Sequence, residues 1–179
     1  MEPRLWTVGH STRSLAEFIE LLTTHDIEML ADVRRYPASR RWPHFSRMPL
    51  LRCLAARGIG YESFPELGGR RQPRADSPNT AWRSAAFRGY ADYMATDEFA
   101  EGLTRLADLG CAFHTAIMCA EAVWWRCHRA LIADGLRWAG FEVYHIMGPG
   151  SSVPHPYTSA AHMEKGFLSY AATTGSAAG

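Results

Sequence analysis

The chain has 179 residues, which is enough for one domain with a substantial hydrophobic core. Its composition, 47% hydrophobic and 21% charged, is that of a globular protein and argues against disorder. The formal net charge of +1 excludes a strong overall field for nucleic acid or an anionic membrane, but it leaves room for a local basic patch.

Short apolar runs alternate with helical patterns along the chain. Ser14 and Glu17 form a capping box before the first helix, and Asp97 is the expected N-cap of a later helix that Gly110 would end. Gly58 and Gly140 are typical stop signals of two other helices. Strands are expected at 5–9, 27–33, 59–64, 112–118 and 141–147, and helices are expected to begin near residues 15, 50, 87, 97 and 127.

This alternation predicts an α/β fold, with a mostly parallel sheet of about five strands and helices on both faces. We expect a single rhodanese- or Rossmann-like domain over residues 1–172 and a flexible C-terminal tail over residues 173–179. The polar segment 65–83 is long for a loop in a compact domain, and such loops are usually functional or disordered.

The sequence also predicts where the protein resides. It has no apolar region behind a basic start and no apolar run of membrane-spanning length, so we expect a cytoplasmic protein without a membrane partner. Its four cysteines should then be reduced, and their spacing matches no standard zinc pattern.

Polar side chains follow several expected strands. Ligands of parallel sheets bind beyond the carboxyl ends of the strands, so these side chains should share one edge. They are His10, Ser11 and Thr12 after the first strand, Asp32, Arg34, Ser39 and Arg40 after the second, Glu66 and Arg70 after the third, Cys119 and Glu121 after the fourth, and His145 on the fifth.

Cys119 is the first candidate for a nucleophile or a redox centre, because a buried strand ends there before a loop and a helix. A helix N-terminus and the nearby Arg126, His128 and Arg129 would stabilise a thiolate or bind an anion. The alternative is that Cys119 is a small buried hydrophobic residue, as free cysteines often are.

The acidic residues and histidines also have two interpretations. Asp32 and Arg34, two apart on a strand, face the same side, and Asp32 is either an acid–base group, an orienter of Arg34 or His10, or half of a structural ion pair. Glu121 is likewise catalytic or structural. His145, at the end of an apolar strand, is by default a core histidine.

Arginines with aromatic residues between them predict a phosphate-bearing ligand, with a solvated rim as the alternative. The arginines are Arg34, Arg35, Arg40, Arg41, Arg47, Arg70, Arg71 and Arg74, and the aromatic residues are Trp42, Phe45, Tyr61 and Trp82.

The segment after the fourth strand resembles a rhodanese or a cysteine phosphatase in its order of strand, cysteine, loop, arginine and helix. The stretch Asp32-Val33-Arg34 also resembles one in rhodaneses. A phosphatase loop has an arginine six positions after its cysteine, where this chain has Trp125, and Arg126 follows one place later. Phosphatase or sulfurtransferase chemistry is therefore an analogy at the level of the fold.

Several motifs together resemble the bacterial family known as domain of unknown function 488. They are Thr7-Val8-Gly9-His10-Ser11-Thr12, Asp32-Val33-Arg34 with Pro37, Ser39 and Arg40, Leu67-Gly68-Gly69-Arg70, Phe87 with Tyr90-Ala91 and Tyr93-Met94, Met118-Cys119-Ala120-Glu121, Cys127-His128-Arg129, and His145-Ile146. The resemblance covers about residues 5–147. It implies an enzyme of unsettled reaction, whose hallmarks are the segments that begin at Cys119 and Cys127. Val123-Trp124-Trp125 replaces the expected acidic-proline turn.

Three hypotheses follow. The first is a cysteine-dependent hydrolase or transferase for an anionic, phosphate-bearing substrate, which could be a nucleotide or nucleic acid. The second is a nucleotide- or nucleic-acid-binding accessory protein without catalysis, and the third is a metal site at Cys119, Glu121, Cys127 and His128. We expect no metal, and the cofactor and the oligomeric state stay undefined. The expected catalytic residues are Cys119, Glu121, Asp32 and His10, and the expected substrate-binding residues are Ser11, Thr12, Arg34, Ser39, Arg40, Arg70, Cys127, His128 and Arg129.

Overall fold

The computed structural model describes residues 2–173, so residues 174–179 of the expected tail lie outside the described part of the chain. Short 3-10 helices at Pro43–Phe45, Pro65–Leu67 and Trp124–Arg126 supplement the regular elements. In chain order these are β1 (Arg4–Gly9), α1 (Leu15–Thr23), β2 (Met29–Asp32), α2 (Arg47–Ala55), β3 (Gly60–Ser63), α3 (Ala85–Tyr93), α4 (Asp97–Ala112), β4 (Thr115–Cys119), α5 (Arg129–Trp138), β5 (Glu142–Gly148), β6 (Ser151–Pro154), β7 (His162–Glu164) and β8 (Phe167–Ser169).

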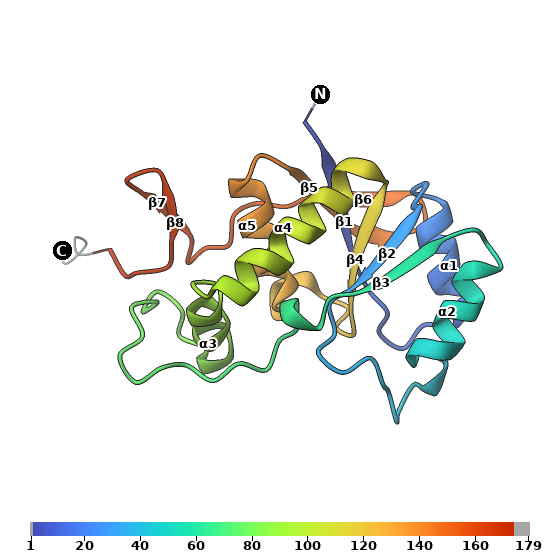
Figure 1. Cartoon of the computed structure of the whole chain (residues 1–179), viewed down its shortest axis with the longest axis horizontal. Helices are drawn as coiled ribbons and strands as arrows, with labels where there is room; N and C mark the ends of the chain where they lie inside the picture. Colours follow the sequence, from blue (N-terminus) through green and yellow to red (C-terminus); the bar gives the residue numbers. More distant parts are fainter. Residues whose placement is uncertain (1, 174–179) are drawn as a thin grey trace.

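The main sheet has six strands in the order β3-β2-β4-β1-β5-β6 (Figure 1). The first five are parallel, and β6 pairs with β5 in the antiparallel direction. The strands β7 and β8 form a separate antiparallel pair near the C-terminus. The α/β class with a mostly parallel sheet and helices is thus confirmed.

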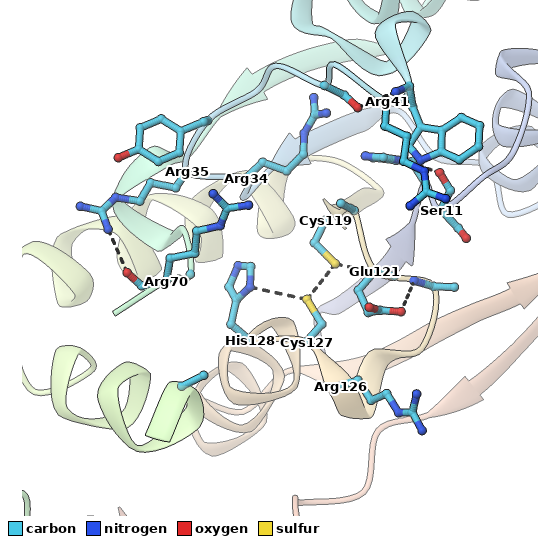
Figure 2. Close-up of a pocket in the computed structure, with 18 of the residues that line it drawn as sticks. Ser11, Arg34, Arg35, Arg41, Arg70, Cys119, Glu121, Arg126, Cys127 and His128 are labelled. Atoms are coloured by element: carbon cyan, nitrogen blue, oxygen red, sulfur yellow. Dashed lines mark hydrogen bonds between the residues drawn. The ribbon is translucent and has the colours of Figure 1, made fainter. Parts of the chain in front are cut away.

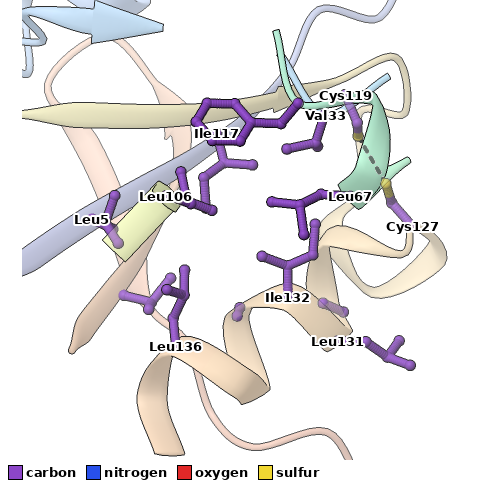
Figure 3. Close-up of a cluster of buried hydrophobic side chains, with 14 of the residues drawn as sticks. Leu5, Val33, Leu67, Leu106, Ile117, Cys119, Cys127, Leu131, Ile132 and Leu136 are labelled. Carbon is purple, nitrogen blue, oxygen red and sulfur yellow. Dashed lines mark hydrogen bonds between the residues drawn. The ribbon is translucent and has the colours of Figure 1, made fainter. Parts of the chain in front are cut away.

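Helices cover both faces of the sheet because the central strands are apolar on both sides. In β4, Ala116 and Met118 pack in one core cluster with α1 and α2. Ile117 and Cys119 point the other way, into the cluster that α3, α4 and α5 cover (Figure 3). A strand buried on both faces reads as a continuous apolar run, which is why the sequence indicated it.

This topology places a crevice at the carboxyl ends of β1 and β4. The two strands are neighbours, with Gly9 opposite Cys119, but β1 leads to α1 on one face and β4 leads to α5 on the other. Such a reversal is the place where ligands bind in open α/β sheets.

Two helix boundaries and three strands differ from expectation. Thr96, rather than Asp97, caps α4, because its side chain accepts a hydrogen bond from the Phe99 backbone N–H. The helix continues past Gly110 to Ala112, and Gly110 instead permits close packing, since a Cβ there would lie 2.8 Å from Leu5 Cδ2. The strands β6, β7 and β8 are short and largely exposed, so no apolar run indicated them.

A buried carboxylate ties the C-terminal segment to α5. Asp134 accepts hydrogen bonds from the backbone N–H and the hydroxyl of Thr158, at 2.9 and 2.6 Å. It also accepts one from the Tyr170 hydroxyl at 2.7 Å, and His155 Nε2 lies 2.8 Å from it. The Asp134 side chain is fully buried, so these contacts replace all of its hydration.

The network continues from His155 toward β1. His145 Nε2 lies 2.8 Å from His155 Nδ1, and the Thr7 hydroxyl lies 2.6 Å from His145 Nδ1. The contacts are satisfied when each histidine donates from Nε2 and accepts at Nδ1. The Trp124 ring stacks on His145 at 4.2 Å, with the ring planes only 4° apart.

No helix within residues 2–173 is long and apolar enough to cross a membrane.

Candidate active site

A cavity of about 840 Å³ opens at the carboxyl ends of β1, β2 and β4. The structure brings most of the predicted site residues to its wall, as expected for side chains that follow neighbouring parallel strands. These residues are His10, Ser11, Thr12, Arg34, Ser39, Arg40, Arg70, Cys119, Glu121, Cys127 and His128. Asp32 and Arg129 do not line the cavity, and both lie buried next to residues that do.

Two sulfur atoms meet at the cavity wall. Cys119 ends β4, and Cys127 follows the turn Trp124–Arg126. Their Sγ atoms lie 2.8 Å apart, and the side chains are almost completely buried (Figure 2). Both residues are free cysteines. The two sulfurs are in direct contact and share a hydrogen bond.

Arg129 lies directly behind the sulfur pair. Its Nη1 donates to Cys119 Sγ at 2.7 Å and to the backbone oxygen of Glu121 at 2.5 Å, and its Nη2 donates to Ala122 O at 3.0 Å. The side chain is 1% exposed, and no carboxylate among residues 2–173 lies within salt-bridge distance of it. The positive charge is therefore buried against sulfur.

The two thiols differ in acidity. Burial raises the pKa of Cys119 well above its usual value, and the hydrogen bond with Cys127 raises it further. Burial opposes ionisation of Cys127 as well. For this thiol, however, the hydrogen bond with Cys119, the Arg129 charge and the Arg129 backbone N–H together outweigh burial and lower the pKa. These opposite pKa directions favour a thiolate at Cys127 and a thiol at Cys119.

His128 is placed to exchange a proton with Cys127. Its Nε2 lies 3.2 Å from Val33 O, which can only accept, so this nitrogen carries the proton. Its Nδ1, 3.5 Å from Cys127 Sγ, then presents a lone pair to the thiol. Burial lowers the pKa of His128, which favours this neutral state.

Asp32 holds Arg34 in place. Arg34 Nε and Nη2 donate to the two Asp32 carboxylate oxygens at 2.9 and 2.8 Å, and its Nη1 donates to Phe45 O at 2.7 Å. The Tyr61 hydroxyl donates to the same carboxylate at 2.5 Å. Asp32 is fully buried, so it orients Arg34, one of the roles that the sequence allowed.

His10 contributes a neutral imidazole to the cavity wall. Its Nδ1 lies 2.9 Å from Ser11 O, and its ring stacks on Phe45 at 4.3 Å. Because burial outweighs the hydrogen bond to Ser11 O, the pKa of His10 falls from 6.5 to about 4. The Nε2 atom then presents a lone pair that can accept a hydrogen bond at neutral pH.

We expect the His10 ring to titrate near pH 4 in the folded protein. The unfolded chain binds this proton nearer pH 6.5, so stability should fall as the pH is lowered from about 6.5 toward 4. Proton NMR of the imidazole, assigned with His10→Gln, measures the midpoint. A midpoint close to 6.5 would contradict the burial of His10 that the structure gives.

The rest of the wall is strongly basic. Its arginines have no carboxylate within salt-bridge distance among residues 2–173, apart from Arg34 with Asp32. In Figure 2, Arg35 and Arg70 lie on one side of the sulfur pair and Arg41 lies on the other. Glu121 is the only acidic residue among the described lining residues. The unpaired arginines are Arg35, Arg40, Arg41, Arg70 and Arg126.

Strained and crowded backbone also gathers here. Ser11 and Arg70 have φ angles of 49° and 61°, in the left-handed region that side chains disfavour. A Cβ at Gly9 would lie 1.8 Å from Glu121 O, and one at Gly69 would lie 2.9 Å from His128 Nδ1. Glycine at these two positions lets β1 and the loop after β3 approach the cysteine segments closely.

Sequence reasoning missed the contribution of α3 to the cavity. Ser84, Phe87 and Tyr90 line it, whereas the sequence indicated Phe87 and Tyr90 only as an apolar helix face. Tyr36, 63% exposed at the rim, was also missed. The available signal was the place of Phe87 and Tyr90 among the motifs of the family resemblance.

No group of three or more histidine, cysteine or acidic side chains in the described range is arranged to hold a metal ion. The fold and the cavity together define an α/β domain with a paired-cysteine, arginine-lined site at the carboxyl edge of its sheet.

The model of the family described as Domain of unknown function DUF488 matches residues 14–136, more than half of the chain, and the chain belongs to that family. The resemblance predicted from the sequence is confirmed. The search of curated proteins and the search of solved structures found no match.

Proposed function

We propose that this protein is a cysteine-dependent hydrolase or transferase that acts on an anionic, phosphate-bearing substrate. The observation that carries the proposal is the buried Arg129 guanidinium, which contacts the sulfur pair and has no acidic partner in the described part of the chain. A buried cation without a counter-ion costs several kcal/mol, on the order of the penalty for any unpaired buried charge. Two thiols that share one proton supply the missing anion.

The proposed nucleophile is the Cys127 thiolate, with Cys119 as its neutral partner. Sequence reasoning placed Cys119 first, and we choose Cys127 because its pKa is lowered, whereas the pKa of Cys119 is raised. His128 Nδ1, 3.5 Å from Cys127 Sγ, can accept the proton when the thiol ionises.

The unpaired arginines would hold the phosphate. A guanidinium binds two phosphate oxygens at once, and a cavity lined by several of them favours a dianion. Arg34 is already committed to Asp32 and Phe45, so we assign direct contacts to Arg40, Arg41 and Arg70 and a positioning role to Asp32.

In the first step the Cys127 sulfur attacks phosphorus, and the bond to the leaving oxygen breaks. Glu121, solvent-exposed at the cavity wall, is the acid–base group that would exchange protons with the leaving oxygen and with the incoming water or acceptor hydroxyl. Attack by that water or hydroxyl on phosphorus then releases the thiolate.

A second function, nucleotide or nucleic-acid binding without catalysis, is favoured by the aromatic residues at the rim. The Arg41 guanidinium lies 5.5 Å from the Trp42 ring centre, and that of Arg35 lies 5.7 Å from the ring of the exposed Tyr36. Such pairs combine phosphate contacts with surfaces on which bases stack.

The test combines binding and turnover. We expect Cys127→Ser to abolish turnover of a phosphate ester found by screening nucleotides and phosphomonoesters, and to keep its binding. Arg41→Gln and Arg70→Gly should weaken binding about 10- to 150-fold each, since a lost charged contact is worth about 1.5–3 kcal/mol. Arg57→Gln, an exposed arginine away from the cavity, is the matched control.

Arg70→Gly has a further use, because glycine accepts the positive φ of this position without strain. The variant should therefore be at least as stable as the wild type, so that weaker binding cannot be attributed to unfolding. Full turnover in Cys127→Ser would exclude Cys127 as the nucleophile. Tight binding by the wild type without turnover of any bound ester would favour the accessory-protein function.

A further inference from the structure

We infer that Cys119 and Cys127 form a reversible disulfide when a hydroperoxide reaches the cavity. Bond formation follows from the placement of the two sulfurs and needs no substrate. Its consequence, inactivation of the thiol site, rests on the function proposed above.

The two sulfur atoms already lie close to the separation of a disulfide bond. The Sγ atoms lie 2.8 Å apart, and a disulfide requires about 2.05 Å, so the sulfurs need to approach by about 0.8 Å. Cys119 is anchored at the end of a central strand, where its backbone oxygen accepts a hydrogen bond from His10 N. Cys127 lies in a connecting turn outside the sheet and α5, so we assign the movement to this residue.

The pair also has the electronic asymmetry that oxidation to a disulfide uses. The reactive form of cysteine is the thiolate, and the positive charge of Arg129, whose Nη1 lies 2.7 Å from the adjacent Cys119 Sγ, favours this form at Cys127. A second cysteine that keeps its proton lies in contact with it and can resolve the oxidised sulfur.

The burial of the two cysteines limits the size of the oxidant that can reach them. Both side chains line the cavity, but Cys119 is only 2% exposed and Cys127 only 6%. A sulfur so nearly covered admits a small molecule more readily than a second protein or a bulky disulfide. Hydrogen peroxide is the smallest hydroperoxide, and it needs no recognition beyond access to the thiolate.

The reaction balances in two steps. The Cys127 thiolate attacks one peroxide oxygen, the O–O bond breaks, and hydroxide leaves and takes up a proton to become water. The Cys119 sulfur then attacks the Cys127 sulfenic acid, so that the S–S bond forms, the S–O bond breaks, and the hydroxyl departs with the Cys119 proton as a second water. The two sulfurs are oxidised by two electrons in total, and a dithiol reductant reverses the change.

The disulfide would switch the site off. It consumes the thiolate of the sulfur pair, which Arg129 contacts through Cys119, so that no thiolate remains for attack on substrate. It also protects Cys127, because a sulfenic acid that is resolved quickly does not proceed to the irreversible sulfinic acid.

The other two cysteines provide an internal comparison. Cys111 is exposed and Cys53 is half-buried, and neither contacts another sulfur in the described part of the chain. If exposure alone governed oxidation, Cys111 would react first. We expect instead that the cysteine pair reacts before Cys111, because the thiolate and its resolving partner are in the cavity.

The experiment treats the full-length folded protein with hydrogen peroxide and reads the intact mass and the cross-linked peptides without reduction. We expect the wild type to lose the mass of two hydrogen atoms, with the link between Cys119 and Cys127, and to regain it with dithiothreitol. The double variant Cys53→Ser with Cys111→Ser should behave identically.

Single variants separate the two roles. Cys119→Ser should stop at a sulfenic acid on Cys127 that dimedone traps, and Cys127→Ser should react at least about tenfold more slowly because the stabilised thiolate is gone. Circular dichroism before treatment establishes that each variant is folded, and Cys119→Ala replaces Cys119→Ser if that variant is not. A wild-type protein that accumulates sulfenic or sulfinic acid without the link overturns the inference. A disulfide that forms in a protein without turnover leaves the inference intact and removes only the proposed function.

Discussion

Replacing Arg129 by methionine is expected to slow alkylation of Cys127 at pH 7 by about tenfold or more, because each unit of pKa changes the thiolate fraction tenfold. The guanidinium is one of the groups that lower the pKa of Cys127 against the opposing effect of burial. Without it, burial meets less opposition and the pKa of Cys127 rises.

The same change should lower the free energy of unfolding by about 2–4 kcal/mol, since it leaves buried or partly buried acceptors without their donor. Arg129 donates to the backbone oxygens of Glu121 and Ala122, and these contacts fix the turn between the two cysteines. Its Nε has no hydrogen-bond partner in the described chain, so the residue is not optimised for stability alone.

Arg129→Lys is the informative control for this prediction. Lysine keeps the charge but cannot bridge the sulfur and two carbonyl oxygens with a rigid fork. We therefore expect Arg129→Lys to retain more of the Cys127 reactivity than Arg129→Met while losing a similar amount of stability. Iodoacetamide kinetics from pH 5 to 10 and urea denaturation measure the two effects. Equal alkylation rates in wild type and Arg129→Met would show that the charge does not stabilise a thiolate.

The sequence was sufficient to predict the edge of the sheet at which the site forms. Apolar runs identify strands, and parallel strands bring their carboxyl ends together, so the segments after β1, β2 and β4 could be assigned to one place. The contacts that join these segments depend on the tertiary fold, so no local sequence pattern predicts them. The contact of Cys119 with Cys127 depends on how the turn Trp124–Arg126 folds back, and no helix or strand period applies because the turn separates the two cysteines.

The role of Arg129 could likewise not be predicted from the sequence. The sequence places it at the start of a helix near two cysteines, but only the fold reveals that it lies behind the cavity, in contact with Cys119 and without an acidic partner in the described range. Even less in the sequence indicated how the C-terminal segment packs against the rest of the fold. His155, Thr158 and Tyr170 converge on one carboxylate from positions 21 to 36 residues further along the chain, with no periodicity that would reveal it.

That carboxylate carries the second large expected effect: Asp134→Ala should destabilise the protein by about 3–5 kcal/mol, the usual cost of breaking a buried charged network. The substitution leaves the His155 ring, the Thr158 N–H and hydroxyl, and the Tyr170 hydroxyl without their shared acceptor. Asp134→Asn keeps one acceptor oxygen but presents an NH₂ group to donors, so we expect an intermediate loss. Urea denaturation measures both.

The loss should also extend to the candidate site, because the network supports the turn that precedes Cys127. His155 orients His145, and the Trp124 ring lies flat against His145 and begins the turn Trp124–Arg126. We expect Cys127 alkylation to change in Asp134→Ala under conditions where circular dichroism still shows a folded protein. If stability falls by less than about 1 kcal/mol, the carboxylate is not the anchor of the C-terminal segment. If stability falls and alkylation is unchanged, the turn is held by Arg129 and the sulfur pair rather than by the stack of Trp124 on His145.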